Sequence, residues 1–127
     1  MRIRPSIFLV SFAAAAAIHA GCSSSYGSPA APSPASAGSA MNLSIVPGAS
    51  TLTTAAFSPN PDTIAVGDTL TWTNNDSTAH TTTADGTAWN SGTIAPGASF
   101  SRTFAAAGTF TYHCAIHPGM VGTVTVR

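Results

Sequence analysis

The chain of 127 residues contains no lysine, no glutamate and no glutamine, and its only acidic side chains are four aspartates. The missing residue types are among the best helix formers on protein surfaces, so the composition disfavours a mainly helical fold. Charged residues make up 6% of the chain, too few for the basic patch that nucleic-acid binding requires. The same scarcity leaves little long-range electrostatic attraction toward any partner.

A hydrophobic run long enough to cross a bilayer is also missing. The longest apolar stretch, residues 7–18, is about a dozen residues long and follows Arg2 and Arg4. A short positive region followed by an apolar stretch of this length is typical of an export signal. We predict a signal peptide over residues 1–21, so the mature protein works in the periplasm or at the cell surface.

Two ways of removing this signal remain open. Ala20-Gly21-Cys22 resembles the end of a bacterial lipobox, in which Cys22 becomes the lipidated first residue. His19 stands where the usual pattern has leucine, so cleavage after Ala20 by a standard signal peptidase is the alternative. The first route gives a lipoprotein anchored to a membrane, and the second gives a free protein.

Residues 22–40 are rich in serine, alanine and proline and show no hydrophobic periodicity. This composition predicts a disordered tether with a root-mean-square reach of roughly 25 Å. The folded domain is expected over residues 41–127.

Short segments of alternating polarity fill this domain. In residues 69–74, Leu70 and Trp72 alternate with threonines, as in a half-buried strand. Pairs of turn-forming residues recur between such segments: Gly67-Asp68, Asp85-Gly86 and Pro96-Gly97. The pattern predicts an all-β fold, an antiparallel Greek-key β-sandwich of seven to eight strands.

Side chains that bind soft metals gather near the C-terminus. Cys114, His117 and Met120 form a C-x2-H-x2-M row between the last two predicted strands, and His80 lies 34 residues before Cys114. One cysteine, two histidines and a weakly bound methionine are the ligand set of a blue copper electron-transfer site. The set predicts one copper ion that cycles between Cu(II) and Cu(I).

The strand before this row favours the same interpretation. Phe110, Tyr112 and Cys114 share one face by the period of two, so the thiol should lie inside the sandwich near its rim. A buried thiol resists ionisation and needs a metal to hold the thiolate. His113 points to the opposite face and is not expected to be a ligand. Asp76 is interpreted as an ordinary turn residue.

These segments resemble the cupredoxins, the small blue copper proteins, and most closely those of the amicyanin type, with plastocyanin next. The resemblance lies in Val66 to Trp72, in Asn74-Asn75 ahead of His80, and in Ala107 to Val126. The resemblance implies that His80, Cys114 and His117 are equatorial ligands and Met120 is axial. It also implies that Thr81 ties the two ligand loops together, where asparagine is the commoner residue.

The predicted function is transfer of single electrons between redox partners, without catalysis. The exposed edge of His117 would meet a redox protein over a small apolar interface, and we expect a monomer. The alternative is a copper chaperone or storage module. Such proteins tend to expose several further methionines or histidines, and this chain has few.

Overall fold

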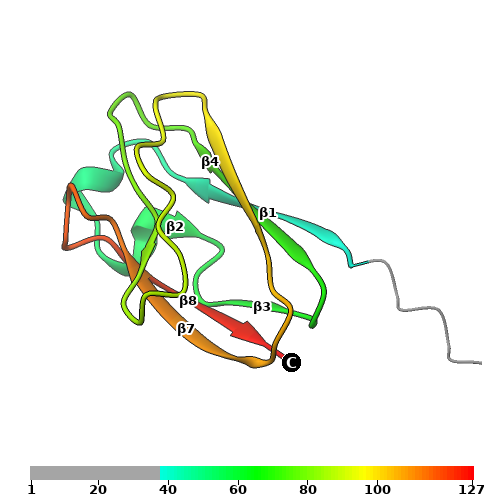
Figure 1. Cartoon of the computed structure of the whole chain (residues 1–127). Coiled ribbons are helices and arrows are strands. Elements are labelled where there is room, and N and C mark those ends of the chain that lie inside the picture. The colour runs from blue at the N-terminus through cyan, green and yellow to red at the C-terminus, as the bar shows by residue number, and fades with distance from the viewer. Residues whose placement is uncertain (1–37) are drawn as a thin grey trace, which may run out of the picture. The chain divides into compact units, whose positions relative to one another are not determined.

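The computed structural model describes residues 38–127, whose regular structure is mainly β-strand (Figure 1). The predicted signal peptide, Cys22 and most of the predicted tether lie outside the described residues. Among the described residues, no helix has the length and hydropathy to cross a membrane. Strand β1 begins at Ala40, one residue before the predicted start of the domain.

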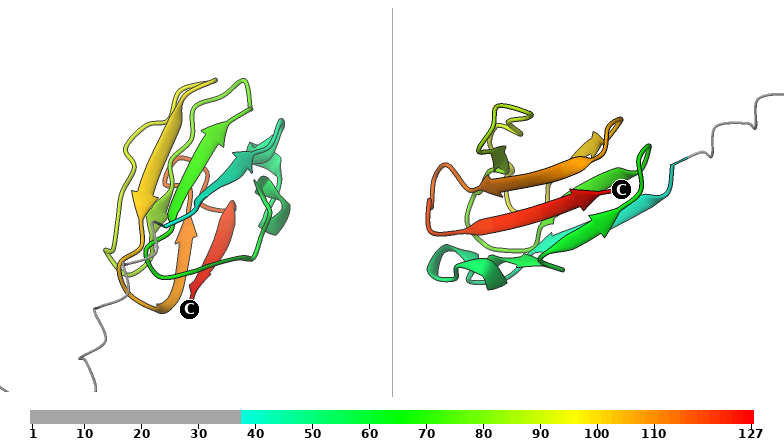
Figure 2. Two further views of the ribbon diagram at one scale, coloured as in Figure 1. Left: turned by 90° about the vertical axis from the view of Figure 1, so that its right-hand side faces the viewer. Right: turned by 90° about the horizontal axis from the view of Figure 1, so that it is seen from below.

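The strands form two four-stranded sheets that pack face to face (Figure 2). The first sheet has the order β2 (Phe57–Ser58), β1 (Ala40–Ile45), β4 (Thr69–Asn74) and β6 (Ser99–Thr103). The second has the order β3 (Asp62–Ile64), β8 (Val121–Val126), β7 (Gly108–His113) and β5 (Thr83–Ala84). Two short 3-10 helices, η1 (Ala49–Thr51) and η2 (Thr54–Ala56), connect β1 to β2.

The predicted all-β sandwich is confirmed, with one correction to its strand pairing. Of the six strand pairs, β1 with β4 and β3 with β8 are parallel, so the sheets are mixed and not purely antiparallel. Parallel neighbours require a crossover connection. The chain supplies one by passing from β1 through the second sheet, at β3, before it returns to the first as β4.

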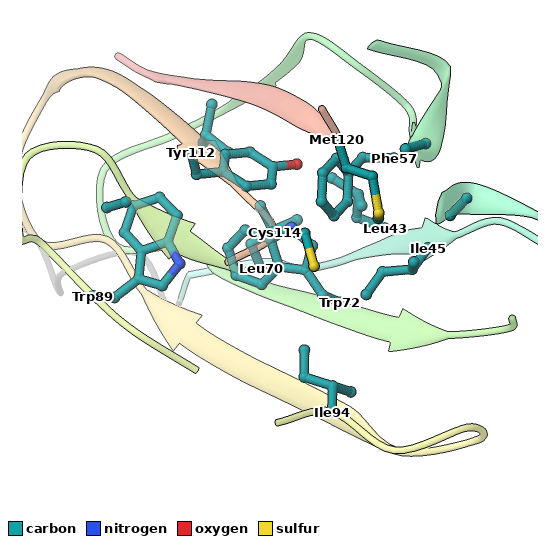
Figure 3. Packing of buried hydrophobic residues seen from close by; sticks show 14 of the residues in the cluster. Leu43, Ile45, Phe57, Leu70, Trp72, Trp89, Ile94, Tyr112, Cys114 and Met120 are labelled. Atoms are coloured by element: carbon teal, nitrogen blue, oxygen red, sulfur yellow. The ribbon is translucent and has the colours of Figure 1, made fainter. Parts of the chain in front are cut away.

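Alternation along the strands separates an aromatic core from a hydroxyl-rich surface. In β4, Leu70 and Trp72 are fully buried, and Trp72 packs its ring against Trp89 and Tyr112 at centroid distances of 5.7 Å (Figure 3). Such tilted and edge-on contacts stabilise aromatic pairs beyond their buried area. On the outer face, the threonines of β4 pair with hydroxyls of β6: Thr69 with Thr103, Thr71 with Ser101 and Thr73 with Ser99.

The two ends of the sandwich have different roles. At one end lie the start of β1 and the C-terminus, where Thr69 donates a backbone hydrogen bond to Ser39 and Val66 donates one to Arg127. At the other end lie the β4–β5 and β7–β8 connections, which hold the candidate metal ligands (Figure 1). The described chain therefore enters at the end remote from these ligands.

Replacing Gly122 by alanine should destabilise the fold. Gly122 lies opposite Tyr112 in the β7–β8 pair, and a Cβ placed on it would lie 2.2 Å from Cζ of the buried Tyr112 ring. Overpacking of this kind costs about 1–3 kcal/mol, so urea should unfold Gly122→Ala at a lower concentration. Gly86→Ala is the control, because a Cβ there meets no atom within 4 Å. Equal midpoints for the two variants would contradict the packing argument.

Candidate metal centre

Three side chains from separate segments meet at one end of the sandwich. His80 comes from the β4–β5 connection, Cys114 follows β7, and His117 lies in the β7–β8 loop. Their ligand atoms all lie within 4.8 Å of one another. Sγ of Cys114 is 3.8 Å from Nδ1 of His80 and 3.9 Å from Nδ1 of His117, and the two Nδ1 atoms are 3.2 Å apart.

This triangle has the size that a bound metal ion requires. A point equidistant from the corners of a triangle with sides of 3.2, 3.8 and 3.9 Å lies about 2.1 Å from each corner. Bonds from a first-row metal to imidazole nitrogen and thiolate sulfur are about 2.0–2.3 Å long. Soft thiolate and imidazole donors also suit copper. The residues present therefore fit a copper ion.

The three side chains differ in their access to solvent. Cys114 and His80 are fully buried, whereas His117 keeps part of its ring at the surface. The structure therefore offers the solvent, and any partner, one edge of the cluster, and that edge is His117.

The loop from Cys114 to Met120 is closed by its own backbone. The N–H of Cys114 donates to the carbonyl of Met120 at 3.1 Å, and the N–H of Met120 donates to the carbonyl of His117 at 2.9 Å. Met120 is fully buried. Figure 3 shows the sulfur atoms of Cys114 and Met120 turned the same way. These contacts hold three of the four predicted ligands within a single tight loop.

Thr81 connects the two ligand-bearing segments through both its backbone and its side chain. Its N–H donates to Sγ of Cys114 at 3.3 Å, and its Oγ1 accepts from the N–H of Ala115 at 2.7 Å. A hydrogen bond to sulfur stabilises the thiolate over the thiol. A threonine hydroxyl therefore joins the two loops. In the family that the sequence resembles, asparagine is the commoner residue at this position.

The far side of the His80 ring contacts a buried carboxylate that the sequence analysis missed. Nε2 of His80 lies 2.8 Å from Oδ2 of Asp76 and 3.1 Å from Oγ1 of Thr78. The backbone N–H of Gly48, followed by the contact with His80, holds the pKa of Asp76 well below its usual range. Asp76 is thus more than the turn residue we had inferred. The spacing Asp-x-x-x-His was the available signal.

His113 lies apart from the cluster, on the outer face of its sheet. Its Nδ1 is 2.5 Å from Oδ1 of Asp85, and both side chains are partly exposed. The contacts with Thr111 and His113 lower the pKa of Asp85. The neighbour of Cys114 in sequence thus interacts with a hairpin aspartate instead of the ligand cluster.

Comparison with known proteins gives the same answer as the geometry. Residues 46–127 match the family of copper binding proteins described as the plastocyanin/azurin family. The chain therefore belongs to this family, the cupredoxins, whose members bind one copper ion.

Individual relatives agree with this assignment. The plastocyanin of Scenedesmus fuscus is 38% identical over 84 residues, which cover 56% of this chain and 86% of that protein. A purple cupredoxin from Nitrosopumilus maritimus superposes with a TM-score of 0.64 at 34% identity, covering 68% of this chain and 99% of that one. A Cu(I) amicyanin variant gives a TM-score of 0.58 at 27% identity, covering 69% and 82%.

Removing the Thr81 hydroxyl should lower the stability of the metal-free protein. In Thr81→Val the N–H of Ala115 loses its acceptor, and loss of one such hydrogen bond costs about 1 kcal/mol. Thr81→Ser keeps the hydroxyl oxygen, so its loss of unfolding free energy should be clearly smaller. Urea unfolding of the metal-free variants measures both. A loss of stability in Thr81→Ser with none in Thr81→Val would show that the methyl group, and not the hydroxyl, supplies the stability.

Proposed function

We propose that the protein is an exported electron carrier that holds one copper ion in a type 1 site. His80, Cys114 and His117 are the strong ligands in this proposal, and Met120 is the weak axial one. The observation that supports it best is the triangle of two Nδ1 atoms and one sulfur, whose centre lies at metal-bonding distance. When bound, copper supplies one-electron exchange between Cu(II) and Cu(I).

The fixed geometry of the site favours electron transfer over copper delivery. The Cys114–Met120 loop is closed by backbone hydrogen bonds, and Thr81 joins it to the segment that bears His80. Ligands held in this way need to move little when the metal changes oxidation state. A chaperone must release its metal to another protein, yet here Cys114 and Met120 are fully buried.

The exposed edge of His117 is the proposed electron port. Its neighbours Ala115, Ile116, Pro118 and Gly119 are all exposed and uncharged, with Ile116 at 48% exposure. An apolar surface of this kind suits brief docking of a redox protein over a small interface. We therefore assign the protein the role of a monomeric carrier and not of an enzyme.

The chain entry and His117 lie at opposite ends of the domain, and this arrangement supports an orientation in which His117 points away from the membrane. The described chain enters at the end of the sandwich remote from the β7–β8 connection (Figure 2), which contains His117. If Cys22 carries a lipid, the anchor joins the domain at that remote end. The port would then face the aqueous compartment, either the periplasm or the cell exterior, and meet its redox partner there.

Visible absorption tests the copper assignment. The mature protein loaded with Cu(II) should show an intense thiolate-to-copper band that ascorbate bleaches and an oxidant restores. Cys114→Ser should abolish this band because the thiolate is its source. His113→Ala is the matched control and should keep the band, because His113 contacts Asp85 outside the cluster. A folded wild-type protein without a reversible band would remove the electron-transfer proposal.

A further inference from the structure

The carboxylate of Asp76 accepts three hydrogen bonds and lies within hydrogen-bond distance of a ring nitrogen of His80. Oδ1 accepts the backbone N–H groups of Gly48 at 3.0 Å and Ser77 at 2.8 Å. Oδ2 accepts the hydroxyl of Thr78 at 3.0 Å and lies 2.8 Å from Nε2 of His80. The side chain of Asp76 is buried, so water offers it few alternatives.

This arrangement determines which nitrogen of His80 carries the proton. A neutral imidazole has one N–H and one lone pair, and an ionised carboxylate can only accept. The proton must therefore lie on Nε2, facing Asp76. The lone pair of Nδ1 is then free on the opposite side of the ring, where Nδ1 lies 3.8 Å from Sγ of Cys114 and 3.2 Å from Nδ1 of His117.

We propose that Asp76 is the positioning residue that selects the metal-binding tautomer of His80, before any metal arrives. The proposal rests on the proposed function in one respect, namely that Nδ1 of His80 binds copper. Partners on the far nitrogen of a ligand histidine are known to fix its tautomer and ring orientation.

Asp76 is itself held rigidly enough for this role. Its own N–H donates to Oδ1 of Asn74 at 2.9 Å, and the buried Asn74 amide donates to the carbonyls of Thr78 and Ile94. Gly48 lies in the β1–η1 connection with a left-handed φ of 76°, and its N–H donates to Oδ1 of Asp76. Two backbone donors therefore anchor Oδ1, and Thr78 and His80 share Oδ2.

The substitution Asp76→Asn has nearly the same shape but the opposite hydrogen-bonding demand. The two backbone donors require an oxygen at the Oδ1 position, so the new NH2 group must face Thr78 and His80. Thr78 can rotate its hydroxyl to accept. Nε2 of His80 can accept only by moving its proton to Nδ1, which removes the lone pair that faces Cys114 and His117.

Nitrogen NMR of the metal-free protein, at a pH where the imidazole is neutral, reads the tautomer directly. Wild-type His80 should carry its proton on Nε2, and Asp76→Asn should shift it to Nδ1. Copper affinity of Asp76→Asn should fall about 10- to 100-fold, the usual loss for such partners. Asp68→Asn is the control, since Asp68 is also buried and accepts two backbone N–H groups, from Ser39 and Ala65, near the opposite end. It should leave both readouts unchanged.

Two results would overturn the inference. One is a wild-type His80 that carries its proton on Nδ1, a measurement that does not depend on whether the variant folds. The other is an Asp76→Asn protein, folded by its NMR spectrum, with the wild-type tautomer and wild-type copper affinity. Failure of the proposed function looks different. In that case the tautomer follows residue 76 as predicted, but wild-type protein forms no reversible thiolate–copper band.

Discussion

The burial of one sulfur atom is the constraint on which the site depends. Alternation along β7 places Cys114 on the same face as Tyr112, and both are almost wholly removed from solvent. A thiolate in such a place is unstable without compensating positive charge or hydrogen bonds. The N–H of Thr81 supplies one hydrogen bond, and the two imidazoles lie where they could hold a metal ion against the remaining side of the sulfur. The alternation of β7 therefore buries the sulfur, and the buried sulfur in turn favours a bound metal ion.

The packing of the sandwich fixes the relative positions of the ligands. Cys114 follows a strand that is paired along its whole length with β8, and the core beneath it is a set of interlocking aromatic rings. The segment that bears His80 is joined to the Cys114 loop by the two hydrogen bonds of Thr81, and it is held from its other side by the bridge between His80 and Ile94. Close-packed interiors resist displacement of this kind of contact. The protein thus holds the three side chains in place in the absence of a metal, and in the proposed carrier this would keep the structural change on electron transfer small.

Features that depend on residue spacing or alternation could be predicted from the sequence. Features that depend on how distant strands pair, or on the direction of a side chain in a turn, could not. The C-x2-H-x2-M row predicted that Cys114 and His117 lie close together, because only two residues separate them in one short loop. The parallel neighbours of β1 and β3 could not be predicted, since pairing between sequentially distant strands leaves no local pattern. Asp76 was missed for a related reason. Aspartate is common in turns whether its carboxylate faces water or a ring four residues later.

The structure suggests why the acidic residues of this chain are aspartates and not glutamates. Three of the four aspartates are buried: Asp62, Asp68 and Asp76. Asp68 and Asp76 each accept two backbone N–H groups, and Asp62 accepts one. The short side chain suits this task, whereas glutamate would have to lose more rotamer freedom. Buried carboxylates thus serve as hydrogen-bond acceptors inside the fold, and neutral hydroxyl pairs line the outer face of the first sheet between β4 and β6. A partner that docks at His117 as proposed would meet exposed residues without charge. Its recognition would then depend on shape and apolar contact at close range, which favours the short-lived complexes of the proposed electron carrier.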